Sequence, residues 1–136
     1  MKNKGIPSLN VVETCLVFVF TQLWAVDSGA TDHICTFLQG FQETRRPSKD
    51  EVCVFQANRE PTPVLTVEII SVSLNNSRFL VLNNVLYAPS IRRNLLSVAR
   101  LMDDGYDVYL HNNNAIISHN NFYIHSAPRV QNLFVF

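Results

Sequence analysis

The chain is 136 residues long, the size of one ordinary domain and enough to bury a single hydrophobic core. Hydrophobic residues make up 47% of it and charged residues 16%, which excludes a disordered, solvating chain. Eleven basic and eleven acidic residues balance to a net charge of zero, so the chain lacks the excess of positive charge typical of nucleic-acid binding.

The N-terminal segment, residues 1–20, is either a linker or the first strand of the domain. Its run CLVFVF, at residues 15–20, resembles a weak secretion leader, but Glu13 interrupts the apolar stretch. The run is also too short to cross a membrane as a helix, and its valines and phenylalanines favour a strand. We therefore expect strands over residues 11–20 and 23–26.

The middle of the chain has the pattern of short strands joined by turns. A short helical turn is expected within residues 33–41, and a strand at residues 51–56. The segment ANREPTP, at residues 57–63, contains two prolines and is expected to form a turn. Residues 64–74 and 79–87 are rich in β-branched and aliphatic side chains and flank LNNSR, so they predict a β-hairpin.

A single helix is expected in the second half of the chain. Apolar side chains recur there at helical spacing and define one face: Ile91, Leu95, Val98, Ala99 and Met102. Ser90 or Asn94 can cap the start of this helix, and Gly105 can end it. Short strands separated by asparagine-rich turns follow over residues 106–136, which predicts a β-meander. The residue pattern as a whole therefore predicts a mainly all-β fold.

The stretch WAVDSGATDHIC, at residues 24–35, carries the strongest chemical signal. An apolar strand ends at Asp27, and Gly29 permits a sharp turn that leaves the carboxylate at the edge of the strand. Ser28 can donate a hydrogen bond there, and backbone amides around the glycine can bond the carboxylate. Two such carboxylates about 3 Å apart share one proton, so one can activate water while the other acts as an acid.

The partner carboxylate is not found within the chain. Asp32 lies on the same turn, and the other aspartates have no Ser-Gly after them: Asp50, Asp103, Asp104 and Asp107. If a dyad exists, its second Asp27 comes from a second copy of the chain, as in a two-fold homodimer.

The same stretch resembles the start of the protease region in Pol polyproteins of copia-type LTR retrotransposons. The segment LVLNNVLYAPSIRRNLLSVARLMDDGY, at residues 80–106, is similar to the part that closes that region, and the resemblance covers most of residues 20–110. It implies a closed retropepsin-like β-barrel over residues 21–110 with one short C-terminal helix. The β-meander at residues 111–136 then leads towards a pre-integrase region.

The resemblance implies an aspartic endopeptidase that cleaves its own polyprotein as a homodimer. The catalytic residue falls on Asp27, and Ser28, Gly29 and Ala30 form the supporting active-site loop. The polyprotein peptide is the implied substrate, in the cytoplasm within the virus-like particle of the element. No metal, cofactor, membrane or direct nucleic-acid contact is expected for this segment.

Two departures from retroviral proteases stand out. RRNLL is similar to the stretch that opens their C-terminal helix, but Arg92 stands where they carry glycine, and we expect Arg92 and Arg93 to be solvated. Their mobile flap usually has glycine at its tip, whereas residues 52–74 contain none. An inactive barrel that survives as a structural or interaction module therefore remains an alternative, and a small secreted β-protein is another.

The cysteines and histidines give no metal-binding pattern. The odd number of cysteines, without a CxxC pair, argues against a disulfide scaffold and a zinc site: Cys15, Cys35 and Cys53. We expect them to be reduced and mostly buried. Asp32, His33 and Cys35 match no ordinary zinc spacing.

Overall fold

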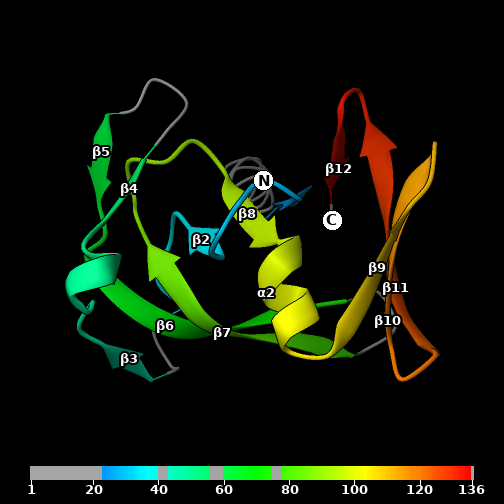
Figure 1. Ribbon diagram of the computed structural model, residues 1–136, viewed down its shortest axis with the longest axis horizontal. Coiled ribbons are helices and arrows are strands. Elements are labelled where there is room, and N and C mark those ends of the chain that lie inside the picture. Colours follow the sequence, from blue (N-terminus) through cyan, green and yellow to red (C-terminus); the bar gives the residue numbers. More distant parts are fainter. Residues whose placement is uncertain (1–22, 40–42, 56–59, 75–77, 136) are drawn as a thin grey trace, which may run out of the picture.

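The computed structural model describes residues 23–39, 43–55, 60–74 and 78–135 (Figure 1). The strand expected at residues 11–20 and the cysteine Cys15 lie outside them. Within this part of the chain none of the helices is long and apolar enough to cross a membrane. The strands are β1 Trp24–Asp27, β2 Ile34–Cys35, β3 Thr44–Arg45, β4 Cys53–Phe55, β5 Pro61–Pro63, β6 Thr66–Ser73, β7 Phe79–Tyr87, β8 Asn94–Ser97, β9 Tyr106–Leu110, β10 Asn114–His119, β11 Phe122–Val130 and β12 Leu133–Val135. The helices are the 3-10 turn η1 Lys49–Glu51 and the α-helix α2 Val98–Asp103.

The strands confirm the mainly β fold. Ten of them are hydrogen-bonded in the order β3-β6-β7-β2-β8-β1-β12-β11-β10-β9, and β4 pairs with β5 as a separate hairpin. Among the described residues this order has two ends, at β3 and β9, and no strand pairing joins them. Closure of the barrel therefore stays a prediction. Figure 1 shows the β4–β5 hairpin at one end of the long axis and strands β9 to β12 at the other.

The predicted hairpin at residues 64–74 and 79–87 is confirmed as β6 and β7, which pair antiparallel. Buried side chains alternate along β6 with a shift where the register changes between Glu68 and Ile70. Asn84 has a positive φ of 54° close to this irregularity, a backbone conformation that asparagine tolerates better than most residues. The C-terminal meander is also confirmed, since β9, β10, β11 and β12 pair antiparallel in succession.

The helix prediction is wrong in its first half. Residues 94–97 form strand β8, and the helix begins only at Val98. Its cap is Ser97, whose hydroxyl accepts a hydrogen bond from Arg100 N–H at 3.1 Å, and neither Ser90 nor Asn94 has this role. The apolar spacing is misleading because β8 lies between β1 and β2, where the sheet supplies its backbone hydrogen bonds. The end of the helix before Gly105 is as predicted.

Two other local predictions are corrected. The short helical turn expected within residues 33–41 is replaced by β2, which pairs with β7 and β8. The proline-rich turn at residues 57–63 is partly extended, because Pro61–Pro63 form β5 opposite β4. Prolines are tolerated there because this small hairpin has free edges, where no N–H is needed for a ladder.

One buried cluster connects β1 with the hairpin, the helix and the meander. Trp24, at 1% exposure, is part of it, together with Leu82, Leu96, Leu101 and Ile117. Trp24 also makes an edge-to-face ring contact with Phe37 at 6.3 Å between centroids. The burial of Trp24 fixes the strand that ends at Asp27.

Candidate functional site

Asp27 is the last residue of β1, and its half-buried carboxylate is held by the turn that follows it. Gly29 N–H donates a hydrogen bond to Asp27 Oδ1 at 2.8 Å. A Cβ on Gly29 would lie 3.4 Å from the same oxygen, which is an ordinary van der Waals contact. The predicted contact between the carboxylate and a backbone amide is therefore present. Ser28 is exposed and forms no hydrogen bond with a described residue.

Strand β8 fixes the loop after Asp27 from one side. It runs parallel to β1 with Ser97 opposite Asp27, while β12 pairs with the other edge of β1. Ser97 Oγ donates to the carbonyl oxygen of Ala30 at 2.7 Å and also caps α2. One buried hydroxyl thus connects the candidate active-site loop with the helix. The sequence analysis missed Ser97, although a serine directly before a helix is a recognisable cap signal.

His33 provides a second attachment for the same loop. The side chain is fully buried, and its Nδ1 accepts a hydrogen bond from Ser97 N–H at 2.9 Å. Burial, followed by the nearby positive charge of Arg100, lowers the pKa of His33 from 6.5 to about 4. The neutral ring carries its proton on Nε2, which is buried and lacks a hydrogen-bond partner among the described residues. His33 therefore serves as an acceptor that stays neutral in mildly acidic solution.

Asp32 is committed to an ion pair. Arg100 donates to Asp32 Oδ1 through Nη2 at 2.6 Å and through Nε at 3.0 Å, which ties the loop to α2 once more. Thr31 Oγ1 donates to the other carboxylate oxygen at 3.2 Å. With both oxygens engaged, Asp32 is poorly suited to share a proton with Asp27, as its position on the same turn suggested.

Asn94 joins the segments on which the loop is built. Its side chain is buried, and its Oδ1 accepts hydrogen bonds from Thr36 N–H and Thr36 Oγ1, each at 2.9 Å. Its Nδ2 donates to the carbonyl oxygen of Leu23 at 2.9 Å. The sequence signal for this joining role of Asn94 was a polar residue within an apolar run. Its partners, Thr36 and Leu23, become known only when distant segments pair in the structure.

A groove of about 700 Å³ lies beside Asp27. Its walls come from the loop after β1, from η1 and β4, and from the segment that leads into β8. The lining residues are Asp27, Gly29, Ala30, Thr31, Asp32, Ile34, Asp50, Cys53, Val54, Phe55, Ile91, Arg92, Arg93 and Leu95. Strand β4 of the β4–β5 hairpin thus contributes one wall, and this hairpin lies within the segment expected to form a flap.

The comparisons with known proteins agree with this arrangement. A family model described as the Pol polyprotein, beta-barrel domain, matches residues 24–106, which is more than half of the chain. The chain belongs to this family. The Pol beta-barrel domain match begins at Trp24 and ends at the first residue of β9. It therefore includes the loop after Asp27, the β4–β5 hairpin and α2.

A curated relative points the same way. The Pol beta-barrel domain described here is 37% identical over 78 residues to the retrovirus-related Pol polyprotein from transposon RE1 of Arabidopsis thaliana. The aligned part covers 57% of this chain but 5% of the relative, so the chain corresponds to a small part of that polyprotein. No solved structure matches the chain.

The thiols of this Pol beta-barrel domain are placed in two environments. Cys35 is fully buried and donates from Sγ to Glu68 Oε2 at 2.9 Å, and burial together with Glu68 raises the pKa of its thiol. Cys53 is half-buried in the groove, and both cysteines are reduced, as expected. Among the described residues no three histidine, cysteine or acidic side chains are grouped so that they could hold a metal ion.

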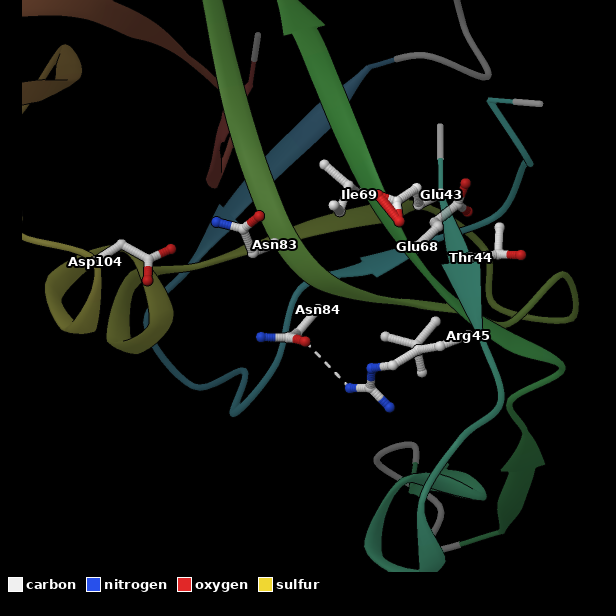
Figure 2. A pocket seen from close by; sticks show the side chains of 9 residues that line it. Glu43, Thr44, Arg45, Glu68, Ile69, Asn83, Asn84 and Asp104 are labelled. Carbon is white, nitrogen blue, oxygen red and sulfur yellow. Dashed lines mark hydrogen bonds between the residues drawn. The ribbon is translucent and has the colours of Figure 1, made fainter. Parts of the chain in front are cut away.

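A second pocket, of about 480 Å³, lies beside β3, β6 and β7 and contains none of the loop after Asp27. Figure 2 shows Arg45 and Asn84 on its wall, where Arg45 Nη2 donates to Asn84 Oδ1 at 3.1 Å. The same guanidinium forms two hydrogen bonds to the carboxylate of Glu51, at 2.7 and 2.8 Å. Because the Arg45 guanidinium is already hydrogen-bonded to Glu51 and Asn84, it is not available to bind a charged ligand in this pocket.

Proposed function

We propose that this domain is the aspartic endopeptidase of a copia-type retrotransposon and cleaves the Pol polyprotein as a homodimer. The observation that carries the proposal is the Asp27 carboxylate, held at 2.8 Å by Gly29 N–H at the edge of a groove. An aspartate fixed at a strand end, beside a space large enough for a peptide, is the arrangement that acid–base hydrolysis of a peptide bond requires.

The mechanism needs two copies of Asp27, one from each chain. Side by side they share a proton, so the ionised carboxylate takes a proton from water while the other donates to the carbonyl oxygen of the peptide. Gly29 N–H keeps one oxygen of each carboxylate in place. Ser28, exposed and without a described partner, is free to bond across the two-fold axis, and Ala30 lines the cleft.

The rest of the chain suits the same proposal. The β4–β5 hairpin would cover the bound peptide, because its strand β4 already forms a wall of the groove. The proposal implies a closed retropepsin-like barrel that works in the cytoplasm, within the virus-like particle of the element. It assigns no metal, cofactor, membrane or nucleic acid to this segment.

A second candidate function is a structural or interaction module without activity. It is favoured by the hairpin, in which the segment from Cys53 to Pro63 contains no glycine and β5 carries two prolines. Prolines fix φ and remove N–H donors, so they restrict the opening that a flap needs.

Autoprocessing distinguishes the two functions. The chain is expressed in frame with flanking polyprotein of the family type, and its fragments are followed by mass across about pH 4 to 7. Asp27→Asn retains an oxygen that accepts from Gly29 N–H, so it should fold but not cleave. Asp107→Asn, an exposed carboxylate outside the groove, is the matched control and should cleave normally. If the wild-type and mutant chains are both folded and neither is cleaved, the protease proposal is refuted and the inactive module is favoured.

A further inference from the structure

We propose that Arg92 and Arg93 give the groove beside Asp27 a preference for peptides that carry an acidic side chain close to an apolar one. The proposal rests on the proposed function, since it names the class of peptide that the same groove takes. Both arginines are exposed, as the sequence predicts, and the proposal gives this exposed pair a role in binding.

The two arginines are unneutralised cations on the groove wall. Arg92 and Arg93 precede β8, are exposed and line the groove, and neither forms a hydrogen bond or ion pair with a described residue. By contrast, Arg45 and Arg100 are each bound to a carboxylate of the chain. Each guanidinium group offers several N–H donors in a planar arrangement that matches a carboxylate.

The acidic residues of the groove do not cancel this charge. Asp32 is neutralised by Arg100, and Asp27 belongs to the reacting pair of the proposed function. Asp50, on η1, is exposed and has no described partner, so it is the single carboxylate that opposes an acidic peptide. Outside the reacting pair, two positive charges thus face one negative charge in the lining.

The remaining lining suits an apolar side chain beside the acidic one. Phe55 is 70% exposed on β4 although it is a large apolar residue. The partly buried side chains of Val54, Ile91 and Leu95 line the same groove. A bound peptide would remove these surfaces from water, which favours binding in proportion to the apolar area covered. The groove therefore combines a cationic subsite with an apolar one.

The test measures peptide binding without cleavage. The full chain carrying Asp27→Asn is titrated with short fluorescent peptides that contain a Leu-Phe pair flanked by glutamate or by glutamine. We expect the glutamate peptide to bind about tenfold more tightly, and this advantage to shrink as the salt concentration rises. Arg92→Gln and Arg93→Gln should each reduce the advantage about threefold, as expected for partly exposed ion pairs.

Two further variants show the direction of the effect. Arg46→Gln removes the same charge from an exposed side chain outside the groove and should leave the preference unchanged. Asp50→Asn removes the opposing carboxylate, so it should tighten binding of the glutamate peptide by about twofold.

The outcomes separate this inference from the protease proposal. Equal binding of both peptides, binding of neither, or an advantage that survives in both arginine variants would overturn it. Arginine variants that dissociate a homodimer would also overturn it, because the cations would then bind the second copy. Cleavage that depends on Asp27 but ignores the glutamate would refute the inference and keep the protease. Binding that depends on the arginines, without any cleavage, would refute the protease and keep the inference about the groove.

Discussion

The buried imidazole of His33 should make the domain less stable as the solution becomes acidic. Its pKa is lowered from 6.5 to about 4, chiefly by burial. Between these values the unfolded chain takes up a proton that the folded chain does not, so protonation favours unfolding. Stability from this group is complete above about pH 6.5 and is lost as the pH falls towards 4.

The size of the effect follows from the shift. Each pKa unit corresponds to about 1.4 kcal/mol, so a change from about pH 7 to about pH 4.5 should cost roughly 2.5 kcal/mol of unfolding free energy. A doubly protonated ring also cannot accept from Ser97 N–H, which His33 Nδ1 does at 2.9 Å. Protonation would therefore break the attachment of the loop to β8.

Urea denaturation of the chain and of His33→Asn, at both pH values, measures the effect. The asparagine Oδ1 can replace Nδ1 as the acceptor but does not titrate, so the variant should lose about 2.5 kcal/mol less than the wild type on acidification. Other groups cancel in this comparison, including Glu51, whose pKa is lowered to about 2 mainly by its hydrogen bonds to Arg45. Equal losses in both proteins would refute the assignment of the acid sensitivity to His33.

Three substitutions test the other contacts of the site by their change in unfolding free energy. Ser97→Ala removes the cap of α2 and the hydrogen bond to Ala30, so it should cost about 1–2 kcal/mol in thermal or urea unfolding; a loss no larger than that of an exposed serine would contradict the role. Asn94→Ala leaves the N–H and hydroxyl of half-buried Thr36 without their acceptor and should cost about 2–4 kcal/mol, whereas a neutral effect would show that water replaces the amide. Gly105→Ala should cost about 1 kcal/mol because φ is +90° at this position, and an unchanged midpoint would mean that the helix end rearranges.

Local patterns in the sequence were sufficient for several elements. The turn after Asp27 was predictable because an apolar strand ends at Asp-Ser-Gly, and the aspartate side chain bonds the backbone N–H two residues later. The β6–β7 hairpin was predictable because two apolar runs of the right length flank a turn rich in asparagine. In both cases the segments that interact follow one another in the chain, so a single stretch of sequence contains the interaction.

Other elements depended on partners far away in the chain. Residues 94–97 have helical apolar spacing, yet they form β8 because β1 and β2 provide hydrogen bonds on both edges. The roles of Ser97 and His33 arise only when this strand lies beside the loop, since the two residues are 64 positions apart. Local propensity differs by a few tenths of a kcal/mol per residue, which a central place in a sheet readily outweighs.

The charged residues of the groove also divide into those that the sequence predicts and those whose role depends on the tertiary structure. The sequence alone predicted Asp27 and its Ser-Gly turn as the candidate site, because these residues are consecutive in the chain. It could not distinguish Arg92 and Arg93 from Arg100, which all lie within one short segment. Only the tertiary structure decided that Arg100 meets Asp32 while the other two line the groove. The physical reason is that the effect of a charge depends on which groups approach it, and those groups come from segments that are brought together only by folding.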